Sequence, residues 1–299
     1  MIKTTGPSLS KPVIFGEVLF DHFPDDSVIL GGAPFNVAWH LQAFGASPLF
    51  ISRVGDDELG GRIRSAMQDW DMNTSGLQMD SVHPTGTVQI EIENGEPSYE
   101  IVPDQAYDFI DEDDLAPITQ GSLLYHGSLA LRNSTSRDAL DKLHTKLDLP
   151  IFIDVNLRAP WWDRDAIISQ LNAARWAKLN DEELRNLSPS HNTLESQAEA
   201  LQEASRLSLL IVTLGEKGAL ARTAEGAIYR IEPEPGISVV DTVGAGDAFT
   251  SVILLGLLSG WDLDKSLHRA QSFASAIVEI RGATPADKEF YNFFTDIQE

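Results

Sequence analysis

The alternation of short, continuously apolar segments with longer amphipathic ones constrains the fold of this chain more than any other feature. Strands that are apolar without interruption are typical of parallel sheets, in which both faces of each strand are covered. The segments predicted to be strands are residues 13–20, 48–53, 123–126, 151–155, 176–179 and 209–213. The segments predicted to be helices are residues 35–44, 57–70, 136–147, 193–206, 245–258 and 263–280. This order predicts an α/β fold with a mostly parallel sheet and helices on both faces.

One region breaks the alternation, because two β segments follow each other there without a helix between them. These segments, 85–93 and 97–103, flank Asn94-Gly95, a pair that is typical of tight hairpin turns. We expect a small antiparallel flap, which could act as a lid if it lies over the strand ends. A surface hairpin without a role is the alternative. The predicted organisation is a single domain over residues 1–299, with lid segments at about residues 21–30 and 85–107.

The balance of charges limits the partners that the chain can bind. Its 22 Lys and Arg against 45 Asp and Glu give a formal net charge of −23 at pH 7. Such a surface repels nucleic acids and anionic membranes, so neither is expected as a partner. The chain has no cysteine, which excludes disulfides, zinc–thiolate sites and a cysteine nucleophile. Its first residues do not resemble a signal peptide and no apolar run approaches the ~18 residues of a membrane span, so a cytoplasmic location is expected.

The segment 241–247, Asp-Thr-Val-Gly-Ala-Gly-Asp, carries the most chemical information. It opens a strongly apolar predicted helix, and Gly244 and Gly246 lack the Cβ atoms that would keep a ligand away from the backbone. The free N–H groups at a helix start favour an anion, and Asp247 would lie beside it. This suits phosphoryl transfer: the amides stabilise the charge on the transferred group while the carboxylate takes a proton from an attacking hydroxyl. The alternative is that Asp247 only supports its own helix as a first-turn acid.

Six motifs, in order over nearly the whole chain, resemble those of the ribokinase-like (PfkB) family of carbohydrate and nucleoside kinases. The motifs are Gly16-Glu17 with Asp21, the segment 31–38 (Gly-Gly-Ala-Pro-Phe-Asn-Val-Ala), the segment 154–158 (Asp-Val-Asn-Leu-Arg), Asn180 with Glu183, the segment 213–218 (Thr-Leu-Gly-Glu-Lys-Gly) and the segment 241–247. The last of these is quite specific by itself. The resemblance implies the ribokinase-like fold and the ATP-dependent phosphorylation of a sugar. A dehydrogenase is disfavoured, because no Gly-x-Gly-x-x-Gly follows the first predicted strand.

The resemblance also implies a role for individual residues. It makes Asp247 the catalytic base, and the amides of Gly244, Ala245 and Gly246 the anion hole. The implied sugar contacts are Asp21, Gly32, Asn36, Asn156 and Arg158. The implied nucleotide contacts are Asn180, Glu183, Thr213, Gly215, Gly218 and Gln271. Helix caps, turns and surface ion pairs are the corresponding alternatives.

ATP and Mg²⁺ are the cofactors that the resemblance implies. Magnesium usually keeps several waters and takes few protein ligands, so Glu183 is expected to order a metal-bound water. Many relatives hold a monovalent cation with carbonyl groups near Asp241, Val243 and the 281–283 turn, which leaves K⁺ open. The chain departs from the family in two places: Gln271 stands where Asn is frequent, and Arg-Gly-Ala at 281–283 where Pro-Gly-Ala is frequent.

The acceptor is expected to be a neutral sugar, because the flap segment 85–110 contains no Lys or Arg to bind a second phosphate. The segments 32–41 and 126–131 resemble the fructokinase branch of the family, which implies the phosphorylation of fructose to fructose 6-phosphate. Ribose, 2-keto-3-deoxygluconate and a nucleoside are the alternative acceptors. A sugar-binding relative without catalytic activity is the alternative of another class. Flaps of this kind often pair between subunits in the family, so a homodimer through the lid is expected.

Overall fold

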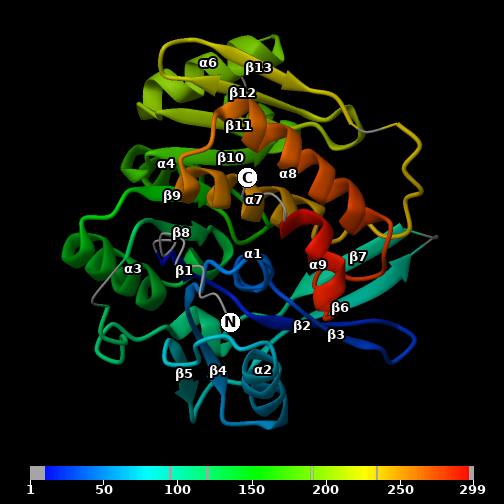
Figure 1. Cartoon of the computed structure of the whole chain (residues 1–299). Coiled ribbons are helices and arrows are strands. Elements are labelled where there is room, and N and C mark those ends of the chain that lie inside the picture. Colours follow the sequence, from blue (N-terminus) through cyan, green and yellow to red (C-terminus); the bar gives the residue numbers. More distant parts are fainter. Residues whose placement is uncertain are drawn as a thin grey trace, which may run out of the picture.

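A nine-stranded sheet runs through the centre of the computed structural model, which describes residues 11–93, 96–118, 121–188, 190, 192–233 and 235–295 (Figure 1). The strand order is β13-β12-β11-β10-β9-β8-β1-β4-β5. Seven strands are parallel: β1 (Val13–Phe15), β4 (Leu49–Gly55), β5 (Leu77–Asp80), β8 (Leu124–Gly127), β9 (Ile151–Asp154), β10 (Trp176–Asn180) and β11 (Leu209–Thr213). Two antiparallel strands, β12 (Ala219–Thr223) and β13 (Ile228–Ile231), complete one edge. The predicted α/β fold with a mostly parallel sheet is confirmed.

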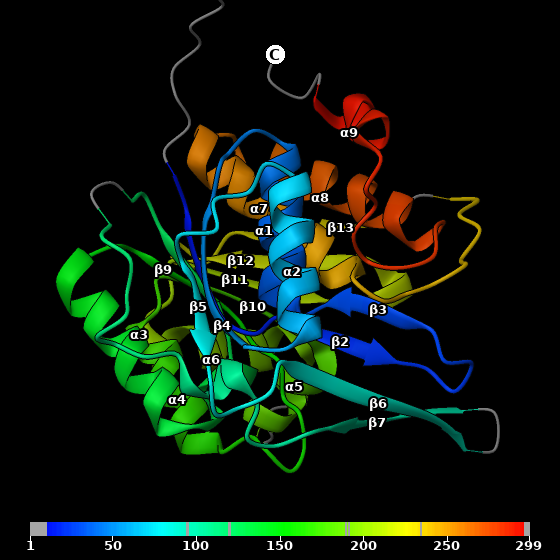
Figure 2. The ribbon, with the colours of Figure 1, turned by 90° about the horizontal axis from the view of Figure 1, so that it is seen from below.

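Helices cover both faces of this sheet (Figure 2). One face carries α1 (Ala33–Ala43), α2 (Glu58–Asp69), α7 (Ala245–Ser259), α8 (Leu263–Val278) and α9 (Lys288–Thr295). The other carries α3 (Ser134–Leu147), α4 (Arg164–Ala173), α5 (Asp181–Leu187) and α6 (Leu194–Ser205). Successive residues of a strand point to opposite faces, so Ile14 enters the first core while Val13 and Phe15 enter the second. Within the part of the chain that the structure describes, no helix combines the length and the apolar character of a membrane span.

A second sheet of four strands, here called the flap, projects from the main sheet (Figure 2). Its strands, in the order β3-β2-β6-β7, are β2 (Leu19–His22), β3 (Val28–Gly31), β6 (Gly86–Glu93) and β7 (Glu96–Ile101). The predicted turn at Asn94-Gly95 lies outside the described residues. The prediction of one continuous strand over residues 13–20 is wrong, because the chain leaves the main sheet at Gly16. Gly16 has a φ of 151°, and a Cβ there would lie 2.4 Å from Pro34 Cγ.

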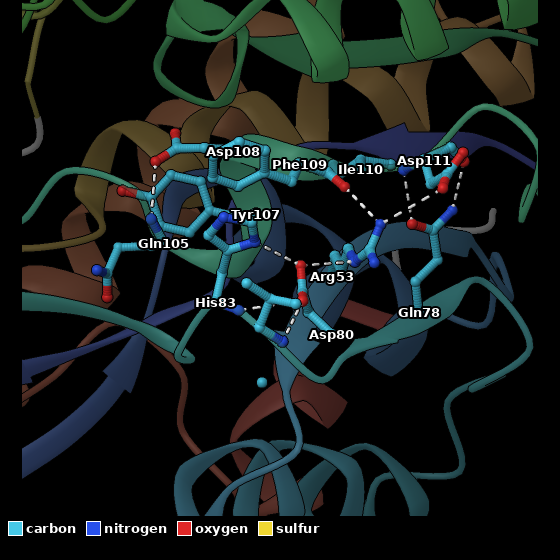
Figure 3. Close-up of polar contacts among 12 residues, drawn as sticks. Arg53, Gln78, Asp80, His83, Gln105, Tyr107, Asp108, Phe109, Ile110 and Asp111 are labelled. Carbon is cyan, nitrogen blue, oxygen red and sulfur yellow. Dashed lines mark hydrogen bonds and ion pairs between the residues drawn. The ribbon is translucent and has the colours of Figure 1, made fainter.

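A polar cluster fixes the chain where it enters the flap (Figure 3). Asp80, at the end of β5, is 3% exposed and accepts hydrogen bonds from the amides of Val82 (2.7 Å) and His83 (3.0 Å). The Asp80 carboxylate also contacts His83 Nδ1 at 2.9 Å and forms an ion pair with Arg53 Nε at 3.1 Å. The ring of His83 stacks on Phe109, with 3.6 Å between the ring centroids. This cluster joins the entry of the flap to β4 and β5.

An ion pair fixes the chain where it returns from the flap. Arg132 donates to both carboxylate oxygens of Asp108, each at 2.7 Å, and to the carbonyl of Val102 at 2.7 Å. Arg132 also lies over the ring of Trp161, 4.7 Å from its centroid. We refer to Arg53, Asp80 and His83 at the entry, with Asp108 and Arg132 at the exit, as the flap anchor.

Candidate functional site

The predicted site residues gather at the carboxyl ends of the parallel strands. The chain orders its strands outward in opposite directions from the pair β1 and β8, and ligands bind at such a switch point in open α/β sheets. Asp154 ends β9, Asn180 ends β10 and Thr213 ends β11. The amino end of α7 belongs to the same place, because the hydroxyl of Thr250 on α7 donates to Asp154 at 2.7 Å.

The glycine loop forms the first turn of α7, as the sequence predicts. Gly244 is the N-cap residue with a φ of 81°, and its carbonyl accepts from the amide of Ala248 at 2.8 Å. Ala245, Gly246 and Asp247 follow as the first helical residues. First-turn amides have no intrahelical acceptor, so the loop presents N–H groups and the positive end of the helix dipole. Of these amides, that of Ala245 donates to the carbonyl of Thr242 at 3.4 Å. Such an arrangement can hold a phosphate.

Asp247 carries a carboxylate suited to proton transfer. Its Oδ2 accepts a hydrogen bond from Asn36 Nδ2 at 2.8 Å. Burial raises the pKa of Asp247 to about 7; the hydrogen bond from Asn36 and the charges of Lys178 and Arg158 lower it, whereas the charge of Asp154 raises it. A general base works best when its pKa is near the working pH. The residue as a whole is of intermediate exposure.

Of the residues predicted to bind the sugar, Asn36 contacts Asp247 directly and Arg158 acts on it electrostatically. Asn36 lies in the first helical turns of α1, and its Oδ1 is buried without a hydrogen-bond partner among the described residues. Gly32 is the N-cap of α1, and the carboxylate of Asp21 lies beside Gly31. Burial raises the pKa of Asp21 to about 6, and the charge of Arg158 lowers it. Since Arg158 acts on both Asp21 and Asp247, its guanidinium lies within electrostatic reach of both carboxylates.

Asn156 is placed through its backbone. The amide of Asn156 donates to the hydroxyl of Ser128 at 2.9 Å, and that hydroxyl donates to the Asn156 carbonyl at 2.7 Å. This exchange joins the segment after β9 to the segment after β8. The structure thus brings together all five predicted sugar contacts at one end of the sheet, and their roles toward a sugar stay predictions.

Asn180 and Glu183, predicted at the nucleotide end, form a capping box at the start of α5. Asn180 Oδ1 accepts from the Glu183 amide at 2.8 Å, and Glu183 Oε2 accepts from the Asn180 amide at 2.8 Å. Glu183 Oε1 accepts from the amide of Leu157 at 3.1 Å. Burial raises the pKa of Glu183 despite these bonds. The pair therefore links the end of β10 to the segment that follows β9. Its roles toward ATP and a metal ion stay predictions.

The other predicted nucleotide contacts lie along β11 and α8. Thr213 ends β11, and the turn after it is closed by a hydrogen bond from the Leu214 amide to the Gly218 carbonyl at 2.8 Å. Gly215 is exposed in this turn. Gln271 lies on α8 and donates to the hydroxyl of Ser275, one helical turn on, at 3.3 Å.

The donors available to a metal ion are few. Across the described ranges, no group of three or more His, Asp or Glu side chains could hold a metal ion. The two turns predicted to offer carbonyl ligands to a monovalent cation are joined by Asp241, whose carboxylate accepts from the amides of Val243 (3.0 Å) and Gly282 (3.1 Å). Carbonyl groups suit K⁺, so the arrangement is compatible with that ion.

Three residues of the site received no role from the sequence: Asp154, Lys178 and Glu17. Lys178 is 7% exposed and donates to both oxygens of Asp154, at 2.7 and 2.9 Å. Its signal in the sequence is that it stands inside an apolar predicted strand, where an ammonium group needs a partner. Glu17 is 2% exposed, burial raises its pKa to about 7, and its Oε2 has no partner among the described residues. We call Gly244 to Asp247, together with Asn36, Asp154 and Lys178, the transfer site.

Several known proteins are similar to this chain in fold and in sequence. The chain is 31% identical over 259 residues to the fructokinase of Klebsiella pneumoniae, covering 82% of this chain and 83% of the relative. The fructokinase of Vibrio cholerae O395 in its fructose, ADP and calcium ion bound form has a TM-score of 0.82 at 26% identity, covering 96% of this chain and 99% of that one. Aminoimidazole riboside kinase from Salmonella enterica, complexed with aminoimidazole riboside and an ATP analog, has a TM-score of 0.81 at 26% identity, covering 95% and 99%.

The match to a family extends over most of the chain and includes every part of the transfer site. Residues 15–289 match the pfkB family of carbohydrate kinases. The glycine loop at the start of α7 and the carboxylate beside it are compatible with phosphoryl transfer to a hydroxyl. This chain belongs to the pfkB carbohydrate kinase family and is a phosphotransferase that acts on a sugar.

Proposed function

We propose that the protein transfers the γ-phosphate of ATP to the primary 6-hydroxyl of fructose. The observation that carries this proposal is the hydrogen bond between Asn36 and Asp247, at 2.8 Å, directly beside the glycine loop. One N–H of Asn36 Nδ2 is thereby directed to the carboxylate, while its Oδ1 has no hydrogen-bond partner among the described residues. A sugar held there has its reacting hydroxyl next to a base and an anion site.

In the proposed reaction, Asp247 accepts the proton of the 6-hydroxyl while the oxygen attacks the γ-phosphorus in line. The new P–O bond forms as the bond from that phosphorus to the β,γ-bridging oxygen breaks, which releases ADP. The amides of Gly244, Ala245 and Gly246 stabilise the charge on the transferred group. Arg158, whose charge acts on Asp247, adds a positive charge on the sugar side.

The choice of fructose rests on charge and on resemblance. The segment 85–110 holds six acidic residues and no Lys or Arg, so it would repel a phosphorylated sugar. The Klebsiella pneumoniae relative is named a fructokinase, and the Vibrio cholerae structure holds fructose. A nucleoside is the second candidate, because the Salmonella enterica kinase of similar fold holds aminoimidazole riboside. Ribose and 2-keto-3-deoxygluconate are further acceptors that the same site could take.

Mg²⁺ is proposed to enter with ATP. The donor set fits an ion that keeps its waters and binds phosphate oxygens, since the described residues offer no cage of carboxylates. Glu183 accepts two amide hydrogen bonds and has further lone pairs for a metal-bound water. When bound, the ion neutralises charge on the β- and γ-phosphates. K⁺ is proposed at the carbonyl groups of the turns that Asp241 joins.

The flap is proposed to close over the sugar as the lid of a single domain. Asp21, a predicted sugar contact, lies on β2 of the flap, so a bound sugar would connect the flap to the main sheet. The outer strands β3 and β7 each have one edge without a partner strand among the described residues, and a homodimer is proposed to form there. Light scattering after size-exclusion chromatography measures the mass and tests this dimer.

A coupled assay of ADP formation over a panel of acceptors tests the proposed function. We expect turnover with fructose in the presence of ATP and Mg²⁺, and little with ribose, 2-keto-3-deoxygluconate or adenosine. Turnover with one of these and not with fructose would replace only the acceptor. The absence of ADP formation with every acceptor, by a protein that binds fructose in calorimetry, would contradict the proposed function.

A further inference from the structure

Lys178 is a buried cation in the middle of the molecule. It lies in β10, and the neighbouring residues Ala177 and Leu179 are fully buried. Its Nζ donates to Asp154 Oδ1 at 2.7 Å and to Oδ2 at 2.9 Å. Removing an ammonium and a carboxylate from water is costly, and an apolar pair of similar volume is often at least as stable. The fold alone therefore gives little reason for a lysine at this position.

The ion pair is connected to the glycine loop. The hydroxyl of Thr250, on the second turn of α7, donates to Asp154 Oδ2 at 2.7 Å and lies 2.9 Å from the carbonyl oxygen of Gly246. A Cβ atom on Gly246 would lie 3.4 Å from Lys178 Nζ, so the ammonium group is in direct proximity to the loop backbone.

Charges of both signs surround Asp247 in the transfer site. Asp247 is faced by Asp154 at the end of β9, by Glu17 after β1, and by the cations Lys178 on β10 and Arg158 beyond β9. A phosphate at the loop adds further negative charge. Two of the three ammonium protons of Lys178 are directed to Asp154, which holds the side chain in one place and leaves one donor. Arg158 is exposed, so Lys178 is the buried one of these two cations.

We propose that Lys178 is a positioning residue for phosphoryl transfer: held by Asp154, it fixes the glycine loop through Gly246 and Thr250 and places a fixed positive charge beneath the transferred phosphate. This inference rests on the proposed function, and adds to it a residue outside the glycine loop. In this proposal, the amides of the loop bind the transferred phosphate and Lys178 adds its charge to theirs. The ammonium group is already in place before the reaction, so it can stabilise the transition state without rearranging.

Three variants separate a positioning role from a purely structural one. Lys178→Met removes the charge and Lys178→Arg keeps it. The double variant Lys178→Met with Asp154→Asn removes both charges, while the introduced carboxamide still offers Thr250 an acceptor. We expect Lys178→Met to lower kcat about 10²-fold, with a much smaller change in KM for fructose. The acid limb of the pH–rate profile should move to higher pH, because the charge of Lys178 lowers the pKa of Asp247.

The melting temperature supplies the readout of structure. Lys178→Met leaves Asp154 buried and unpaired and should melt lower than the wild type, whereas the double variant should regain stability but not kcat. Lys178→Arg should keep more kcat than Lys178→Met. The proposal is overturned if kcat of Lys178→Met stays within about threefold of the wild type, or if the double variant regains kcat together with stability. A wild type without turnover on any sugar would instead count against the proposed function.

Discussion

The fold shifts the pKa values of two aspartates in opposite directions: it raises that of Asp247 in the transfer site and lowers that of Asp80 in the flap anchor. Burial disfavours the ionised form of Asp80, but hydrogen bonds from the side chain and amide of His83 and the amide of Val82, with the charge of Arg53, outweigh it and lower its pKa. At Asp247 burial prevails, and the pKa rises to about 7. More donors meet the Asp80 carboxylate than the Asp247 carboxylate, and Asp247 also faces the negative charge of Asp154.

This difference separates a carboxylate that holds the fold from one that can do chemistry. The lowered pKa of Asp80 means that its stabilising effect is present above the unfolded-state pKa of about 4 and is lost as the pH falls below it. The raised pKa of Asp247 has the opposite sign, so the native state loses stability as the pH rises from about 4 to about 7. A carboxylate kept short of donors is ready to accept a proton.

The largest expected effect is that of Asp247→Asn. An amide cannot take the proton of the acceptor hydroxyl, so kcat should fall about 10³-fold while the loop still binds ADP. The melting temperature at alkaline pH should stay the same or rise, because a poorly satisfied ionised group is removed. Steady-state kinetics measures the loss of kcat, and calorimetry measures the binding of ADP.

The matched control for this variant is Asp264→Asn. Asp264 is also an acid in the first turn of a helix, α8, and it is 65% exposed. The variant Asp264→Asn should leave kcat unchanged. Equal loss of kcat in both variants, or none in either, would mean that Asp247 only supports its helix.

Arg132→Met should have the next largest effect, on stability rather than on catalysis. It leaves Asp108, 1% exposed, without its bidentate partner, and removes the hydrogen bond to Val102. Breaking a buried pair in this way should lower the free energy of unfolding by about 3–5 kcal/mol. Urea unfolding measures the change. Arg185→Met, which removes a surface ion pair with Asp181, should cost less than about 1 kcal/mol; similar losses in both would contradict the role of the flap anchor.

Asp80→Asn should have a smaller effect of the same kind. The variant loses the ion pair with Arg53, and the amides of Val82 and His83 then donate to a neutral oxygen instead of a charged one. These losses should lower the free energy of unfolding by about 2 kcal/mol. At a temperature well below unfolding, kcat should change little. Asp71→Asn, which removes an exposed pair with Lys288, is the control. A loss of kcat in Asp80→Asn at unchanged stability would refute the division between the two regions.

The main sheet and its helices follow from patterns that are local in the sequence. The apolar segments that became β4, β8, β9, β10 and β11 are readable because each is buried on both faces. The edge strand β13 is not predicted from the sequence, because its exposed positions break that pattern. Strand β12 is not predicted either, because it contains Arg222, which the sequence alone suggests is a surface residue. In the structure, Arg222 is buried against Gln202 and Glu199.

The transfer site also has a part that is local in the sequence and a part that is not. Gly244, Gly246 and Asp247 lie within four residues and form a motif, and the structure places them together at the start of α7. Lys178 and Asp154 are 24 residues apart, and Thr250 is 96 residues from Asp154. Their contact exists only because β9 and β10 are neighbours and α7 begins above them. No spacing in the sequence reports such a contact, although the lysine inside an apolar strand was a sign that a partner had to exist.

The pH dependence of kcat/KM for fructose tests the raised pKa of Asp247 most directly. The rate should fall below a midpoint near pH 7, by about tenfold for each pH unit, as Asp247 becomes protonated in the free enzyme. The control variant Asp264→Asn should show the same midpoint. A rate that stays level from about pH 8 down to about pH 5, where an ordinary aspartate is still ionised, would contradict the account.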